Sequence, residues 1–138
     1  MPIKTLSQKY FGQALDDVQA VLQENKPEMQ KIYGGLCHKF PVMVLTCGLC
    51  QTIAFVESKT VGNDRDRIHA YKLLRAHVAA LLGLPAGSMP SAVRDASLSD
   101  YMRYTRRIRQ AWVYYKRFAV SLLKVESAAD LEKQEETP

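Results

Sequence analysis

The chain has 138 residues, of which 47% are hydrophobic and 24% charged. A chain of this length is expected to form one domain around a single core. No apolar run reaches the ~18 residues that span a bilayer, and no signal-peptide core follows the first methionine. Because the chain looks unsecreted and its three cysteines are an odd number, we expect no disulfide framework and a reducing, cytoplasmic location.

Charge is divided unevenly along the chain. Residues 125–138 hold five acids and one base, whereas the whole chain has 19 bases and 14 acids. Residues 1–124 therefore carry +9 (18 bases, 9 acids) and the C-terminal segment −4. A basic body favours a polyanionic partner, although a soluble protein can be basic without one. We expect a single helical domain over residues 1–124 and an acidic, mobile tail over residues 125–138.

The hydrophobic pattern is helical along almost the whole chain. A first helix is predicted over about residues 5–24, with Pro27 marking its end. A short amphipathic piece over residues 28–32 follows, and Gly34-Gly35 is predicted to interrupt it.

A third helix is predicted from Pro41, a favoured first-turn residue, to about Lys59. Its apolar residues point in nearly every direction, which is typical of a buried central helix. Glycine costs about 1 kcal/mol inside a helix. Gly48 is therefore expected to have a packing reason, such as the close approach of a neighbouring helix.

A fourth helix is predicted from the N-cap Asp64 to just before Gly83, and residues 83–92 are expected to form a loop. Ser97, with Asp100 three residues later, resembles a capping box that opens a long helix ending near residue 124. No segment alternates at period two, so no strand is predicted. The expected fold is all-α, a compact bundle of five to six helices around a buried central helix.

The last helix combines a wide apolar face with a basic one. We place Tyr114 in the middle of the basic face, with Arg109 and Lys116 flanking the core side. Arginines one turn apart can follow phosphates, and a tyrosine among them can stack on a base, although most charged faces are merely solvated. A weaker basic face is predicted on the fourth helix. The candidate nucleic-acid contacts are Arg103, Arg106, Arg107, Tyr114, Arg117 and Lys124, with Arg65 and Lys72 on the fourth helix.

Cys47 and Cys50 form a Cys-x-x-Cys pair, with Cys37 next to His38 upstream. A zinc site would need a second ligand pair, and adjacent residues rarely converge on one ion. A redox pair usually sits at a helix N-terminus, whereas Cys47 would lie nearly two turns inside the predicted third helix. We therefore interpret the cysteines as small buried residues and predict no metal and no cofactor.

Residues suited to catalysis are scattered. The three histidines form no metal-binding pair, and no Gly-rich phosphate loop is present. Asp16 and Asp17 are adjacent on a helix, so their side chains diverge by about 100°. No nucleophile with a plausible base can be assembled, so we predict a protein that is not an enzyme.

Two segments resemble a known family. They are Phe40-Pro41-x5-Cys47-Gly48-Leu49-x-Gln51-x-Ile53-Ala54-Phe55, followed by Lys59, and Tyr101-x3-Thr105-x5-Ala111-x4-Lys116-Arg117-Phe118-Ala119. Both are similar to the Cmr small-subunit family of type III-B CRISPR RNA-guided effector complexes. Phe40 stands where that family usually has leucine, and Cys47 where a residue such as asparagine is expected.

The resemblance implies a non-catalytic helical subunit that stacks with copies of itself. Its implied partners are a large catalytic-type subunit, a backbone subunit, guide RNA and target RNA. The matching residues are structural, so the candidate contacts above rest on the helix faces alone. Two other interpretations stay open, a helical DNA-binding regulator and a metal or thiol protein. Against the regulator, the last helix is long for a recognition helix.

Overall fold

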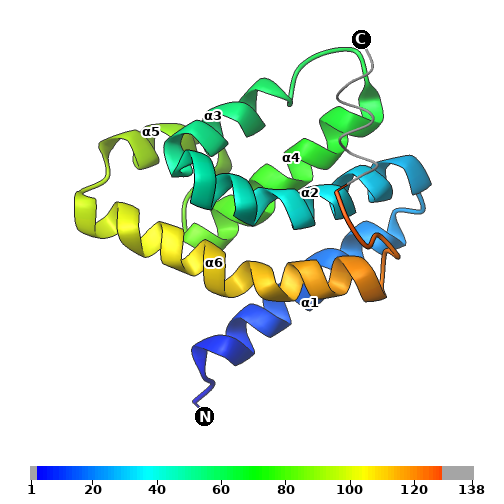
Figure 1. Cartoon of the computed structure of the whole chain (residues 1–138), viewed down its shortest axis with the longest axis horizontal. Helices are drawn as coiled ribbons and strands as arrows, with labels where there is room; N and C mark the ends of the chain where they lie inside the picture. Colours follow the sequence, from blue (N-terminus) through cyan, green and yellow to red (C-terminus); the bar gives the residue numbers. More distant parts are fainter. Residues whose placement is uncertain (1–2, 129–138) are drawn as a thin grey trace.

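The computed structural model describes residues 3–128, in which all the regular structure is helical (Figure 1). In chain order the elements are α1 (Leu6–Gln23), α2 (Pro27–Cys47), α3 (Leu49–Ser58), α4 (Arg65–Leu82), the 3₁₀ turn η1 (Ala86–Ser88), α5 (Met89–Asp95) and α6 (Leu98–Ser121). The prediction of an all-α bundle is confirmed.

Helix α1 begins where the sequence predicts. The Thr5 side chain accepts a hydrogen bond from the Gln8 backbone N–H, and the Gln8 side chain accepts one from the Thr5 N–H. This reciprocal capping box satisfies two N–H groups that would otherwise lack partners. The buried face packs along α6 and consists of Tyr10, Ala14, Val18 and Val21.

Helix α2 is the buried central helix, and the predicted breaks within it are wrong. It continues through Gly34-Gly35 and through Pro41, which lies inside the helix and not at its start. Buried side chains recur every three or four residues along it, so tertiary packing outweighs the poor helix propensity of glycine and proline. These side chains are Met29, Ile32, Tyr33, Leu36, Cys37, Phe40 and Val44.

The break that the sequence does not reveal lies at Gly48. Its φ of 86° and ψ of 160° fall in a region that is essentially restricted to glycine. The predicted helix from Pro41 to Lys59 is therefore two helices, the end of α2 and the whole of α3. Across the break, the Cys50 N–H donates to the Tyr101 hydroxyl at 3.1 Å, which ties the start of α3 to α6.

The caps of α4 and α6 are confirmed. Asp64 accepts from the Arg67 N–H, Gly83 adopts the left-handed conformation, and Ser97 accepts from the Asp100 N–H. The predicted loop over residues 83–92 is wrong in part, because η1 and the first turn of α5 occupy residues 86–92.

The core is rich in aromatic rings. Trp112 stacks on Tyr115 with ring centroids 4.1 Å apart, and Phe40 of α2 lies 4.9 Å from Trp112. Within the described residues, no single helix has the length and hydropathy to cross a membrane, although the bent pair of residues 65–82 and 86–95 meets both criteria together.

The chain folds back onto α2 after α6 ends. Val125 is buried against Gly34, where an added Cβ would lie 2.6 Å from the valine side chain. This contact explains why residue 34 lacks a side chain although the helix runs through it. Of the acidic tail predicted from residue 125, residues 129–138 lie outside the described residues.

Gly48→Ala is expected to destabilise the protein by roughly 1–3 kcal/mol, the usual cost of forcing a side chain into a backbone region reserved for glycine. Urea unfolding followed by circular dichroism measures this change.

Gly12→Ala is the matched control. Gly12 lies inside α1 with nothing within 4 Å of an added Cβ. That change should stabilise the protein by about 0.5–1 kcal/mol. Equal effects of the two substitutions would contradict this account of the α2–α3 break.

Candidate nucleic-acid interface

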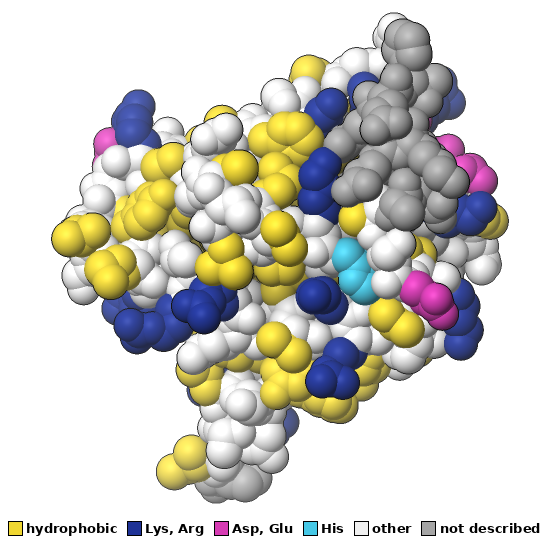
Figure 2. Space-filling model, viewed as in Figure 1, with side chains coloured by type: hydrophobic (Ala, Val, Ile, Leu, Met, Phe, Trp, Pro, Cys, Tyr) yellow, Lys and Arg dark blue, Asp and Glu magenta, His cyan; other side chains and the backbone are white. Residues whose placement is uncertain are grey.

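The exposed side of α6 carries a cluster of cations. The helix buries Ile108, Ala111, Trp112, Tyr115 and Ala119 against α1, α2 and α4. The opposite side therefore faces solvent. We define the outer face of α6 as its exposed basic residues, which are Arg103, Arg106, Arg109, Lys116 and Arg117. In Figure 2, Lys and Arg side chains follow the line of α6, and acidic side chains are visible at the margins and to the right of the cyan histidine.

Arg109 and Lys116 belong to this face, although sequence reasoning placed them at the flank of the core. The buried stripe of α6 is narrower than the apolar pattern indicates, because Tyr104, Phe118 and Leu122 are only partly buried. On a helical wheel centred on Ile108, Trp112 and Tyr115 both cations still lie at the flank, so their exposure follows from the structure alone.

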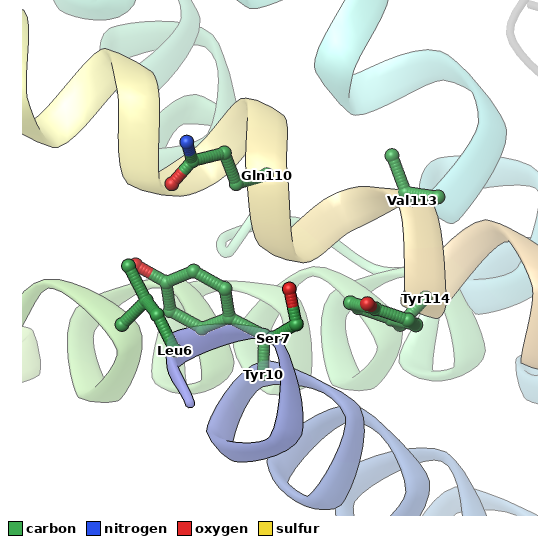
Figure 3. A pocket seen from close by; sticks show the side chains of 6 residues that line it. All are labelled: Leu6, Ser7, Tyr10, Gln110, Val113 and Tyr114. Carbon is green, nitrogen blue, oxygen red and sulfur yellow. The ribbon is translucent and has the colours of Figure 1, made fainter. Parts of the chain in front are cut away.

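Tyr114 is half-buried on the side of α6 that faces α1. Its ring packs edge-to-face against Phe11 of α1, with centroids 5.8 Å apart. Figure 3 shows Tyr114 with Gln110 and Val113 on α6, opposite Leu6, Ser7 and Tyr10 on α1. These six residues line a shallow cavity of about 330 Å³. In this arrangement Tyr114 joins two helices, and its ring is half-buried.

The predicted arginines differ in how available they are. Arg103 forms an ion pair with Asp100 one turn earlier, and both side chains are exposed. Such surface pairs contribute little free energy, so a phosphate can compete for the guanidinium. Arg107 is half-buried. Arg106 is exposed, and it forms no ion pair with any residue between positions 3 and 128.

Two clefts border the outer face. Arg106 and Arg109 line the first together with Tyr101, Met102 and Thr105. The second, which we call the His38 cleft, has a volume of about 290 Å³ and is lined by His38, Val113, Lys116, Arg117 and Val120. Each cleft places two cations beside apolar side chains, which suits an extended polyanion whose phosphates alternate with less polar groups.

The remaining candidates lie elsewhere. Arg65 and Lys72 are exposed on α4, a different helix from the outer face. Their neighbour His69 contacts Glu24 at 2.7 Å, so it ties α4 to the end of α1. Lys124 is exposed just beyond α6, with a positive φ of 61°.

The cysteines do not behave as predicted. Cys47 ends α2 and Cys50 lies in the first turn of α3, and both are exposed and not buried. Only Cys37 is buried, and burial raises the pKa of its thiol. Among the described residues, no group of three or more His, Cys, Asp or Glu side chains is placed to hold a metal ion.

A buried polar cluster joins four helices. The Tyr33 hydroxyl of α2 and His77 Nδ1 of α4 share a hydrogen bond of 2.6 Å. The Tyr115 hydroxyl of α6 donates to Asp17 Oδ2 of α1 at 2.5 Å, and His77 Nε2 lies 3.9 Å from Asp17 Oδ1. Sequence reasoning dismissed Asp17 because it considered only the neighbouring Asp16, whereas the fold supplies partners far away in the chain.

The cluster contains a tyrosine, a histidine and a carboxylate, as many catalytic sites do. Tyr33, however, is 0% exposed, so a substrate cannot reach its hydroxyl. Burial lowers the pKa of His77, and Asp17 and Glu24 oppose this effect. Burial also raises the pKa of Tyr33 well above its ordinary value. The cluster is therefore a set of hydrogen bonds that holds α1, α2, α4 and α6 together.

Comparison with known proteins points to one family. Residues 6–122 match the family described as CRISPR-associated protein (Cas_Cmr5). The chain is similar to the CRISPR system Cmr subunit Cmr5 of Thermus thermophilus, with 31% identity over 128 residues, covering 88% of this chain and 99% of the relative. It also resembles the crystal structure of a CRISPR-associated Cmr5 family protein from the same organism, with a TM-score of 0.69 and 32% identity, covering 86% of this chain and 98% of that one.

The lowered pKa of His77 predicts a pH dependence of stability. The unfolded chain binds a proton near pH 6.5, whereas the folded chain resists protonation until lower pH. The contribution of His77 to the free energy of unfolding is therefore fully present above about pH 6.5 and is lost as the pH falls below that value. Urea unfolding at pH 7.5 and 5.5 should show this loss, and His77→Gln should reduce the difference between the two pH values. If the original protein and the His77→Gln variant lose the same free energy of unfolding between pH 7.5 and 5.5, His77 is not the source of the pH dependence.

Proposed function

Since the chain belongs to the CRISPR-associated Cas_Cmr5 family, we propose that it is a non-catalytic small subunit of a type III-B CRISPR effector complex. In this role it assembles with copies of itself and with other Cmr subunits, including a large catalytic-type subunit and a backbone subunit. Its basic surface contacts the guide and target RNA. The family match supports membership of the complex, and the surface of the molecule supports the two kinds of contact.

The outer face of α6 is the observation that carries RNA contact. Its five exposed cations lie on one side of a single helix, and the acid that pairs with one of them, Asp100, is itself exposed. Phosphate contacts of this kind bind without sequence preference and weaken steeply with salt. This behaviour fits a subunit that must hold any guide and target, because base pairing between the two RNA strands then supplies the specificity. Arg65 and Lys72 on α4 form a second, smaller basic surface that we assign the same role.

Exposed apolar side chains support assembly with other subunits. Val42 and Leu45 near the end of α2 are 54% and 60% exposed. In Figure 2, hydrophobic side chains gather over α2 and α3. Exposed apolar patches of this kind mark protein interfaces. We call Val42 and Leu45 the α2 patch.

A second apolar surface lies at the N-terminal end of α1. The first turns of this helix project beyond α6 (Figure 1), and Ile3 and Leu6 are 98% and 53% exposed. The α2 patch and this projecting end lie on different helices. Copies that join two unlike surfaces associate head to tail, which produces a stack and not a closed pair.

Replacing Arg106 and Arg117 with glutamine is expected to weaken binding of target RNA by the reconstituted complex. Each phosphate contact that is lost should reduce the magnitude of the slope of log K against log salt by about 0.7–0.9. The slope of the double variant should therefore be smaller in magnitude by roughly 1.4–1.8. Filter binding at several salt concentrations measures both the affinity and the slope.

The control is Lys31→Gln with Arg94→Gln, which removes the same charge. Both residues are exposed and already pair with acids, Lys31 with Glu28 and Arg94 with Asp95. An identical salt slope for test and control variants would contradict the assignment of the outer face. Replacing Arg65 and Lys72 with glutamine in the same assay decides whether α4 contributes to RNA binding. Preference for duplex DNA over RNA would instead favour a DNA-binding regulator.

Val42→Ser with Leu45→Ser should reduce incorporation of the chain into the complex without lowering its melting temperature. Both side chains are exposed, so their removal costs the isolated fold little but deprives an interface of apolar area. Co-purification with tagged partner subunits measures incorporation. Val61→Ser, at a 70% exposed position after α3, is the control. Unchanged incorporation of the double variant would remove the α2 patch from the assembly surface.

A further inference from the structure

The chain leaves α6 in a fixed direction. Lys124 adopts a positive φ of 61°, a conformation that costs free energy for a residue with a Cβ. The turn that it forms lets the Val125 N–H donate to the Ala119 carbonyl at 3.0 Å. The Val125 side chain is buried over Gly34, and its carbonyl accepts a hydrogen bond from His38 Nε2 at 2.7 Å. Three independent contacts therefore anchor residue 125 to α2 and α6.

This anchor lies at the edge of the His38 cleft. His38 both holds the Val125 carbonyl and lines the cleft. The other lining residues are two cations, Lys116 and Arg117, and two valines, Val113 and Val120. Neither cation forms an ion pair within residues 3–128. The cleft thus combines an apolar floor with two cations that form no ion pair among the described residues.

The chain continues past the described residues with ADLEKQEETP, residues 129–138. This segment contains four acids and one lysine, a net charge of −3. Its first part, Asp130-Leu131-Glu132, places an apolar side chain between two carboxylates. A chain extends by about 3.3–3.6 Å per residue, so Leu131 can lie up to roughly 20 Å from the anchored Val125. The His38 cleft begins within that range, because His38 itself contacts Val125.

We propose that residues 129–138 bind the His38 cleft of their own chain and compete there with RNA phosphates. Leu131 packs on Val113 and Val120, and the flanking carboxylates pair with Lys116 and Arg117. Charge complementarity, the anchored exit of the chain and the short connection favour this occupant over another molecule. The binding itself needs no RNA. The competition rests on the proposed function of the outer face.

Such a contact is weak enough to exchange. Ion pairs between exposed side chains contribute little individually and are screened by salt. The tether compensates by holding the segment at a high effective concentration beside the cleft. The acidic segment therefore covers Lys116 and Arg117 until a longer polyanion displaces it. Non-specific RNA, which offers few simultaneous contacts, is excluded more than RNA held in the assembled complex.

Zero-length carbodiimide cross-linking of the full chain tests the contact without RNA. We expect links from Lys116 to Asp130 or Glu132, lost at high salt and weakened by Leu131→Ser but not by the control Gln134→Ser. Lys9, exposed on α1, is the internal reference. Mixing isotope-labelled with unlabelled chains separates links within a chain from links between chains. Links that join Lys9 as often as Lys116, or that form only between chains, would overturn the proposal.

Binding of a single-stranded RNA of mixed sequence by the full chain tests the competition. The apparent affinity is the intrinsic affinity multiplied by the fraction of chains whose site is open. If the segment covers the cleft in roughly four chains of five, Asp130→Asn with Glu132→Gln should therefore raise affinity at low salt about fivefold. Unchanged affinity in a chain that binds RNA would overturn the competition. If neither protein binds RNA, the proposed RNA contact fails together with the competition, while the cross-links still decide whether the segment occupies the cleft.

Discussion

Helix α2 packs against α3, α4 and α6, and the side chains that it buries recur from Met29 to Val44. Its position determines which surfaces of the other helices remain free. Phe40 and the Trp112–Tyr115 stack turn one side of α6 inward, so the arginines on the other side face solvent. The same helix receives Val125 at Gly34, which brings the end of the described chain next to Lys116 and Arg117. The basic face and the exit of the acidic segment are both consequences of how α2 is buried.

Much of this fold could be predicted from local signals. Thr5, Asp64, Ser97 and Gly83 lie at helix ends where their chemistry places them, because caps depend on neighbours within one turn. The predicted helix ends are wrong where contacts between residues far apart in the sequence determine whether the helix continues. Gly34 and Pro41 look like breaks, yet α2 passes through both because its buried face extends over them. Gly48 looks like a packing residue, yet its positive φ ends the helix.

The candidate site was predictable to a similar degree. The arginine spacing on α6 predicted that this helix exposes a basic side, because a helical period is a local property. It did not identify the partners of Tyr114, since Phe11 is far away in the sequence. Nor did it find the buried cluster of Asp17, Tyr33, His77 and Tyr115, which exists only when four helices meet. Residues that resemble the Cmr small subunits are mostly packing residues. Family membership therefore follows from the core, whereas the proposed function depends on the surface.

We propose that the outer face of α6 lies against RNA in the assembled complex. Ultraviolet cross-linking of the reconstituted complex to target RNA, followed by mass spectrometry of the peptides that carry nucleotides, tests this claim most directly. We expect nucleotides attached to peptides of α6 between residues 103 and 117, with fewer attachments as the salt concentration rises. Cross-links that form only with other helices of this chain, or only with the partner subunits, would contradict this contact.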